Sequence, residues 1–323
     1  MKLILALDFG GTKLAAGIVN ADSREWLNYE RRLSPSNADA NTDLDIMRSL
    51  IHSLLQDATP SAIGVSFGGP VDATTGTVRL SHHVPGWENI PLKNLLEEEF
   101  GVITSVDNDA NVAALGEQKF GAAQGYDSLF YITISTGVGG GWILNGKPWR
   151  GAVGMAGEIG HMVVDKNGPV CLCGKRGCVE RLASGSYMAK DVKNYLLNQP
   201  EQQKNPEGLI LRTLVNSNLD LITGKIISEA AAQGDQLATK TLLNGAWALG
   251  VGIGNVANLI NPQLFILGGS VTKAGELWWS MLQKTARETA LPEVSLEIVP
   301  AALADDAPLW GAVALAQEIL SRE

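Results

Sequence analysis

Residues 2–19 read KLILALDFGGTKLAAGIV, two apolar runs separated by the polar turn Asp8-Phe9-Gly10-Gly11-Thr12-Lys13. This pattern predicts a strand, a glycine turn and a returning strand. Paired glycines leave successive backbone N–H groups open to an anion, and Thr12 and Lys13 add a hydroxyl donor and a cation. Asp8 could hold Mg²⁺ near a triphosphate. The Walker A pattern G-x-x-x-x-G-K-[ST] is absent, and a single turn of this kind is also explained as an ordinary hairpin.

Two further glycine turns follow apolar runs. STGVGGG (135–141) follows the predicted strand 128–134, and Gly268-Gly269-Ser270 follows the apolar residues FIL. Because open α/β sheets bind ligands at the carboxyl ends of their strands, three such turns together favour nucleotide binding. The hairpin pattern of residues 128–146 also repeats the opening one, which leaves internal duplication and coincidence equally open.

Apolar periodicity predicts an α/β fold. The segments 42–57 and 91–101 have helical spacing, and Gly101 ends the second of them. We expect further strands at 62–69 and 261–271, helices from about 223 to 260, and a helix at 308–320. Residues 199–208, QPEQQKNPEG, predict an exposed loop.

Length and composition narrow the function classes. The 323 residues predict two domains, and the formal net charge of −9 counts against binding to nucleic acid. The first apolar run is too short to span a membrane and lacks a signal-peptide cleavage site, so we expect a cytoplasmic protein without a membrane partner. The apolar segment 245–260 is interrupted by glycine and asparagine, which favours a buried helix.

Acidic and amide side chains gather at the end of another predicted strand, in Val106-Asp107-Asn108-Asp109-Ala110-Asn111. Phosphoryl transfer to a hydroxyl needs a group that accepts the hydroxyl proton, and a carboxylate can serve as that base. Asn108 could bind a neighbouring hydroxyl. The alternative is that Asp107 or Asp109 simply caps the following helix.

A histidine precedes a compact cysteine cluster. The cysteines are Cys171, Cys173 and Cys178. An odd, clustered set without a signal peptide argues against disulfides and for a metal. With His161 they form a Cys₃His donor set, which is typical of closed, structural zinc sites. Glu158 and Glu180 flank the cluster, either as solvated surface residues or as acids that hold sugar hydroxyls.

Seven segments together resemble the ROK family (repressor, open reading frame, kinase). In order they are LALDFGGTKLAAGIV, SFGGPVD, PGWENIPL, DNDANVAALGE, STGVGGGWILNGKPWRGAVGMAGEIGH, CLCGKRGCVE and LGGSV. The combination of G-E-I-G-H with C-x-C-G-x-x-G-C-x-E is the most specific of these features. No single glycine turn has comparable weight.

The resemblance implies an actin-like (ribonuclease H-like) α/β sugar kinase fold, with the active site in an interdomain cleft and a zinc knot. It implies an N-terminal domain over residues 1–115, onto which a C-terminal helix at about 308–323 packs back. A larger C-terminal domain would then span 116–307 and carry the zinc-binding segment. Members of the family usually dimerise, so we expect a homodimer or a higher homo-oligomer.

The resemblance also implies a role for each site residue. Asp109 is the general base, and the sugar contacts are Gly69, Asn108, Asp109, Glu158, His161 and Glu180. ATP with Mg²⁺ meets Asp8, Gly10, Gly11, Thr12, Lys13, Thr136, Gly137, Gly268 and Gly269. Structural zinc is held by His161, Cys171, Cys173 and Cys178.

These residues predict an ATP:hexose phosphotransferase, with glucose as the first-ranked sugar. Kinases for fructose, mannose or N-acetylated hexosamines remain alternatives, since sugar choice depends on pocket shape. A sugar-sensing repressor is the second class. The net charge of −9 and the strand beginning at Lys2, with no helix-turn-helix before it, count against that class. An actin-like filament protein is the third class, and it has no need of a zinc knot.

Overall fold

The computed structural model describes residues 2–81, 83–199 and 207–322. The core of the predicted loop 199–208 lies outside the described residues. The chain divides into two compact units. The first comprises residues 1–131, 141–156 and 301–323, and the second comprises 132–140 and 157–300. This division assigns residues 116–131, 141–156 and 301–307 to the first unit, whereas the sequence predicted them in the C-terminal domain.

A five-stranded sheet forms the centre of the first unit, in the order β3-β2-β1-β4-β7. The strands are β1 (Leu3–Phe9), β2 (Lys13–Asn20), β3 (Trp26–Leu33), β4 (Ala62–Phe67) and β7 (Thr104–Asn108). The predicted opening hairpin is confirmed, because β1 pairs antiparallel with β2. β4 runs parallel to both β1 and β7, so the carboxyl ends of these three strands lie at one edge of the sheet.

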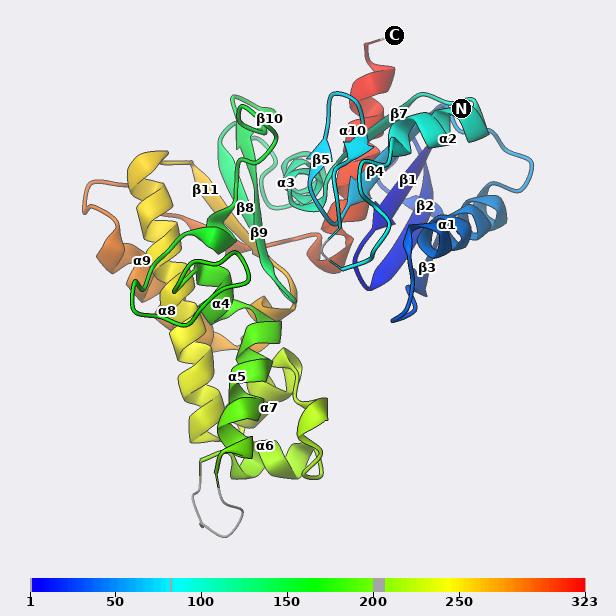
Figure 1. The fold of residues 1–323 in the computed structure, drawn as a ribbon. Helices are drawn as coiled ribbons and strands as arrows, with labels where there is room; N and C mark the ends of the chain where they lie inside the picture. The colour runs from blue at the N-terminus through cyan, green and yellow to red at the C-terminus, as the bar shows by residue number, and fades with distance from the viewer. Residues whose placement is uncertain (1, 82, 200–206, 323) are drawn as a thin grey trace. The chain divides into compact units, whose positions relative to one another are not determined.

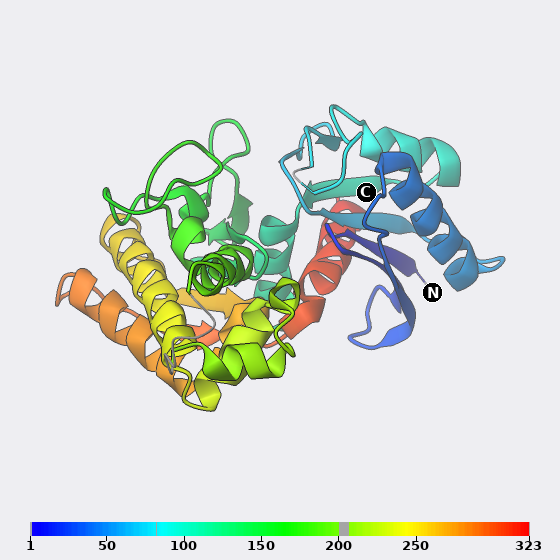
Figure 2. The ribbon, with the colours of Figure 1, turned by 60° about the horizontal axis from the view of Figure 1, so that its bottom comes forward.

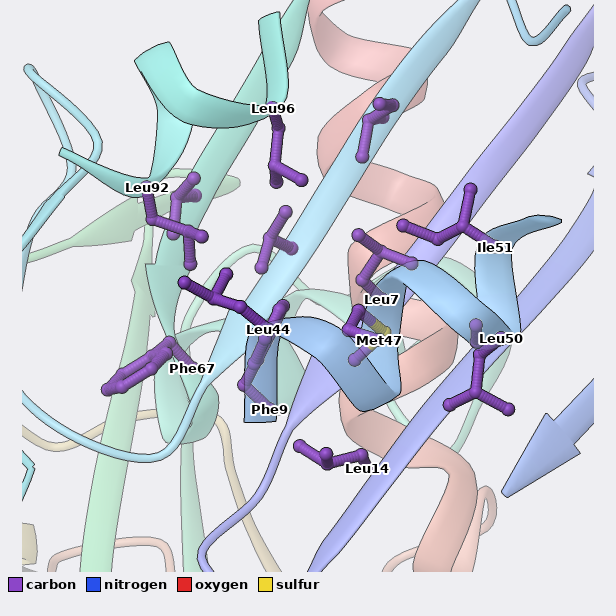
Figure 3. Close-up of a cluster of buried hydrophobic side chains, with 14 of the residues drawn as sticks. Leu7, Phe9, Leu14, Leu44, Met47, Leu50, Ile51, Phe67, Leu92 and Leu96 are labelled. Carbon is purple, nitrogen blue, oxygen red and sulfur yellow. The ribbon is translucent and has the colours of Figure 1, made fainter. Parts of the chain in front are cut away.

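Helices α1 (Ala40–Leu55) and α2 (Leu92–Phe100) cover one face of this sheet. Alternate residues of β1, namely Leu5, Leu7 and Phe9, point into the apolar cluster beneath them, as the two-residue period of a strand requires. Figure 3 shows this cluster, with Met47 and Leu50 of α1 lying over the strands. Gly101 ends α2 in the left-handed conformation, as predicted.

The other face of the sheet is covered by the C-terminal helix α10 (Ala307–Leu320), which packs on β1 and β4 and on α3 (Asp109–Phe120). Figure 1 shows α10 in red behind the strands. Small residues permit this close approach. A Cβ atom added at Gly64 of β4 would lie 1.8 Å from the carbonyl oxygen of Ala312. A short hairpin, β5 (Val71–Asp72) with β6 (Thr77–Val78), follows β4.

A second five-stranded sheet has the order β10-β9-β8-β11-β12. Its strands are β8 (Leu129–Ile134), β9 (Val138–Leu144), β10 (Lys147–Trp149), β11 (Leu264–Gly268) and β12 (Ile298–Pro300). β9 begins inside the predicted glycine turn, so the turn is shorter than expected. β11 and β12 are parallel, whereas β9 and β10 are antiparallel.

Helices make up most of the second unit. They are α4 (Val179–Ala183), α5 (Gly185–Leu197), α6 (Leu209–Leu214), α7 (Gly224–Ala232), α8 (Gln236–Leu259) and α9 (Glu276–Thr289). Short 3₁₀ turns occur at Ile159–His161, Leu219–Leu221 and Ser270–Ala274, and a further one at Ala304–Asp306 belongs to the first unit. Figure 2 shows α8 and α9 side by side. Although α8 is apolar and contains the segment 245–259, no described helix has the length and hydropathy needed to cross a membrane.

Candidate active site and metal-ligand group

The acidic turn between β7 and α3 places Asp109 in the first helical turn. Asn108 is the N-cap of α3, and its Oδ1 accepts hydrogen bonds from the N–H groups of Ala110 (3.0 Å) and Asn111 (3.4 Å). Neither aspartate therefore acts as the cap. Asp109 is half-buried, and its Oδ1 accepts hydrogen bonds from Asn108 Nδ2 and from the Ala110 N–H, both at 2.9 Å.

Asn108 also joins this turn to the neighbouring strand β4. Its Nδ2 donates to the carbonyl oxygen of Gly69, 3.1 Å away. Gly69 follows β4 with no room for a side chain, because an added Cβ would lie 2.5 Å from the carbonyl oxygen of Leu80. Three of the predicted sugar contacts, Gly69, Asn108 and Asp109, are thus held together at the carboxyl edge of the first sheet.

The predicted phosphate turn, residues 10–13, follows β1 at the same edge. The Gly10 N–H donates to the Lys13 carbonyl oxygen (3.1 Å), which closes the turn, and Thr12 and Lys13 are exposed at its tip. An added Cβ at Gly10 would lie 2.8 Å from that same oxygen. Trp87 supports the base of the turn, because its ring packs edge-on against Phe9 and Phe67 at the ends of β1 and β4.

Asp8 is the half-buried carboxylate beside the phosphate turn. Its Oδ1 accepts a hydrogen bond of 2.8 Å from the Ser66 hydroxyl. The pKa of Asp8 is raised to about 7, mainly by burial and to a smaller extent by the charge of Asp109, while the Ser66 hydrogen bond and Arg31 oppose the shift. A carboxylate in this environment favours a cation as a partner.

Asp8→Asn should stabilise the protein without nucleotide, and the gain should be larger at pH 8 than at pH 5. Because the folded-state pKa is about 7 against an ordinary 3.8, the folded protein holds a proton that the unfolded chain releases. Stability is therefore lost as the pH rises between these two values, and the amide removes that loss. The melting temperatures of the variant and of wild type, compared at the two pH values, measure this gain in stability. The exposed Asp45→Asn is the control, and an equal shift at both pH values would contradict the assignment.

Two glycine turns of the second unit lie against each other. Ser135 belongs to one turn and Ser270 to the other, and their hydroxyl oxygens are 3.2 Å apart. Gly269 has a φ of +89°, and a Cβ there would lie 2.3 Å from the carbonyl oxygen of Ile134. The predicted nucleotide residues Thr136 and Gly137 are therefore brought close to Gly268 and Gly269.

Glu180 of α4 lies directly against the first of these turns. Its Oε2 accepts a hydrogen bond of 2.9 Å from the Val138 N–H, and a Cβ added at Gly137 would lie 2.7 Å from the same oxygen. The exposed Glu158 begins the 3₁₀ turn that carries His161, whose N–H donates to the Glu158 carbonyl oxygen (3.0 Å). The predicted sugar contacts of this unit thus border both the predicted nucleotide residues and the cysteine cluster.

The four predicted metal ligands form one group. The ligand atoms of His161, Cys171, Cys173 and Cys178 all lie within 4.8 Å of one another. The Cys173 and Cys178 sulfurs are 3.6 Å apart, and the Cys171 sulfur is 4.0 Å from His161 Nδ1. Tetrahedral zinc with ordinary bond lengths separates its ligand atoms by about 3.8 Å, so the donor set and the spacing both fit zinc.

The backbone around these four ligands folds tightly upon itself. The Cys171 N–H donates to the Lys175 carbonyl oxygen (2.8 Å), and Gly177 adopts a φ of +65° where a Cβ would lie 1.7 Å from the Asp165 carbonyl oxygen. Burial, then the neighbouring Cys173 thiol, raises the pKa of Cys178 to about 12. A thiolate at Cys178 therefore needs a bound cation.

Comparison with known proteins identifies the family of this chain. The ROK family model matches residues 4–319. The chain belongs to the ROK family. A glucokinase of Thermotoga maritima is 30% identical, over 98% of each chain. A solved ROK family glucokinase of Streptomyces griseus, in complex with glucose and AMPPNP, is 35% identical, with a TM-score of 0.83 and 98% and 99% of the two chains covered.

The ROK family also contains regulators. A Bacillus subtilis xylose repressor is 31% identical over 95% of this chain and 75% of its own length. Family membership therefore confirms the resemblance and the actin-like α/β fold.

Sequence reasoning missed Arg150, the residue that pairs with Asp107. Arg150 follows β10, and its guanidinium contacts the buried Asp107 carboxylate at 2.6 Å. The only available signal was Asp107 itself, an acidic residue at the end of an otherwise apolar strand. Its partner lies 43 positions away, and no pattern in the sequence points to it.

Proposed function

We propose that this protein is a glucokinase, which transfers the terminal phosphoryl group of ATP to glucose and yields glucose 6-phosphate. The observation that carries the proposal is the half-buried Asp109 carboxylate, oriented by two N–H donors at the carboxyl edge of a sheet that also bears a glycine turn. The match to glucokinases over 98% of the chain supports ATP and glucose as the substrates.

Asp109 acts as the general base. Phosphoryl transfer proceeds through a loose transition state, so catalysis consists mainly of positioning and charge stabilisation. The carboxylate accepts the proton of the attacking sugar hydroxyl, and Asn108 binds a neighbouring hydroxyl through its amide. Because Asn108 Nδ2 also donates to Asp109 and to Gly69, these three residues fix the orientation of the sugar that accepts the phosphoryl group.

The nucleotide is held by backbone and side-chain donors of the glycine turns. The turn at Gly10 and Gly11, with the Thr12 hydroxyl and the Lys13 ammonium group, contacts phosphate. Thr136, Gly137, Gly268 and Gly269 contact the remainder of the nucleotide. Asp8 fits Mg²⁺, since burial raises its pKa and a bound cation would favour the ionised carboxylate. Bound Mg²⁺ would neutralise charge that develops on the phosphates.

Zinc at His161, Cys171, Cys173 and Cys178 is proposed as structural. A Cys₃His set leaves no open coordination position for chemistry. Since Nδ1 of His161 faces the Cys171 sulfur, the other ring nitrogen is left to bind a sugar hydroxyl, next to Glu158 and Glu180. The metal would then fix the sugar-binding side chains of the second unit.

Cys173→Ser should remove zinc and weaken glucose binding, with the KM for glucose raised about tenfold or more. Elemental analysis gives the metal content, and titration calorimetry gives glucose affinity. An exposed residue of the same loop, Leu172, provides the control Leu172→Ser, which should keep its zinc and its affinity. A wild-type protein that contains no zinc and binds glucose normally would contradict the metal assignment.

A coupled ADP-release assay tests the function. The purified protein with Mg·ATP is offered glucose, fructose, mannose and N-acetylhexosamines, and the product is identified by NMR. Strong turnover on glucose supports the proposal, and turnover on another sugar corrects the substrate. Sugar binding without turnover on any sugar would favour the regulator alternative, which the similarity to a xylose repressor keeps open.

Two further expectations belong to the proposal. A glucokinase acts where ATP and free glucose meet, so we propose a cytoplasmic location, consistent with reduced cysteines that can bind metal. We also propose a homodimer or higher homo-oligomer, which analytical ultracentrifugation would test.

A further inference from the structure

Asp107 is a buried carboxylate next to the proposed base, and every hydrogen bond described for it comes from the catalytic turn or from Arg150. It is 2% exposed. Its Oδ1 accepts from the Asn108 N–H (2.8 Å) and from Asn111 Nδ2 (3.2 Å). Its Oδ2 accepts from Arg150 Nε (2.7 Å) and contacts Arg150 NH2 (2.6 Å). A buried charge persists only when it is paired and hydrogen-bonded in this way.

A continuous chain of hydrogen bonds connects Arg150 to Asp109. Arg150 binds Asp107, Asp107 binds the Asn108 backbone, and the Asn108 side chain binds Asp109 Oδ1 at 2.9 Å. Asn111, also held by Asp107, lies in the first turn of α3. The guanidinium therefore supports the position of the whole turn that carries the base.

Arg150 is itself held at a defined place in the chain. It follows β10 directly, and its carbonyl oxygen accepts a hydrogen bond of 3.0 Å from the Ala156 N–H. Gly151 and Gly154, with φ values of +70° and +79°, allow the intervening loop to close. The chain reaches Glu158, a proposed sugar contact, two residues after this loop ends.

We propose that Arg150 is a positioning residue for phosphoryl transfer. Through Asp107 it holds the Asn108–Asp109 turn in the geometry that the acceptor hydroxyl requires, and it anchors the loop that leads to Glu158. The inference rests on the proposed function and deepens it. Small displacements of a base reduce turnover steeply, so the effect should fall on kcat rather than on nucleotide binding.

Arg150→Gln should lower kcat about ten- to hundredfold and leave the KM for ATP within about threefold. Arg150→Lys should recover part of the loss, because lysine keeps the charge but lacks the planar pair of donors. Asp107→Asn should lower kcat about as much as Arg150→Gln does. The double variant should have a kcat no lower than that of the less active single variant, because both substitutions break the same Asp107–Arg150 interaction. The control is Arg79→Gln, which removes the exposed pair with Asp72 in the same unit.

Hydrogen exchange provides a readout that needs no turnover. In Arg150→Gln, the amides of residues 107–111 should exchange faster than in wild type, while those of β1 and β4 stay protected. Unchanged kcat with unchanged exchange would overturn the proposal, and so would faster exchange throughout the first unit, which indicates only a folding role. If wild type phosphorylates no sugar, the proposed function fails, and the localised exchange still decides whether Arg150 positions the turn.

Discussion

Asp109→Asn is expected to lower kcat for glucose phosphorylation by about 10²–10⁴-fold while glucose still binds. The amide has nearly the same shape as the carboxylate and can still accept through one oxygen from Asn108 Nδ2 and the Ala110 N–H. It cannot accept the proton of the attacking hydroxyl. The loss should therefore appear in turnover, with the KM for glucose changed far less.

Steady-state kinetics with glucose and Mg·ATP, together with calorimetric titration of glucose, separate these two quantities. The exposed Asp45 on α1 supplies a matched control, since Asp45→Asn makes the same chemical change outside the proposed site. Near-native turnover in Asp109→Asn would show that another group takes the proton. Loss of glucose binding to the same extent as turnover would make Asp109 a binding residue rather than a base.

The local parts of this fold were predictable because their causes are local. Alternating apolar residues and a glycine pair specify the β1–β2 hairpin, and apolar positions at helical spacing specify α1. β3 was not predicted, because an edge strand that is mostly exposed has a polar sequence without a clear alternation. The first residues of β9 were predicted as part of a turn, because glycines within a strand resemble a glycine turn in the sequence.

The site was predictable where the chemistry lies in short motifs. The three cysteines lie within eight residues of one another and Asn108 and Asp109 are adjacent, and the structure brings each set together. Residues that support the site from a distance were not predictable. Glu117, fully buried in α3, accepts hydrogen bonds from the N–H groups of Ala302 and Leu303, which lie more than 180 positions away. Nothing in the sequence around a single glutamate indicates such partners.

Gly311→Ala is expected to lower the stability of the protein strongly. A Cβ atom at Gly311 of α10 would lie 1.8 Å from the carbonyl oxygen of Val112 and 2.5 Å from its carbonyl carbon, both in α3. These are backbone atoms of a packed helix, so no side-chain rotation relieves the overlap. Alanine favours a helix by about 1 kcal/mol over glycine, which is too little to offset the displacement of one helix from another. The free energy of unfolding should fall by about 3 kcal/mol or more.

A graded series tests this explanation. At Gly116 of α3 the closest backbone atom to an added Cβ is 2.6 Å away, whereas at Gly252 of α8 the closest atom is a Val179 methyl at 3.2 Å. Denaturant midpoints should therefore fall most for Gly311→Ala, less for Gly116→Ala, and least for Gly252→Ala, which changes stability by about 1 kcal/mol at most. If Gly311→Ala yields no folded protein, the denaturant midpoints of Gly116→Ala and Gly252→Ala still test the explanation.

The same series connects packing to catalysis. α3 begins at Asp109, and Val112, the residue that Gly311 contacts, is in its first turn. A helix displaced to admit a methyl group at Gly311 would move the base as well as lose stability. Folded Gly311→Ala or Gly116→Ala protein should therefore have a lower kcat than Gly252→Ala. Equal stability of all three variants would mean that α10 packs less closely on α3 than the structure shows.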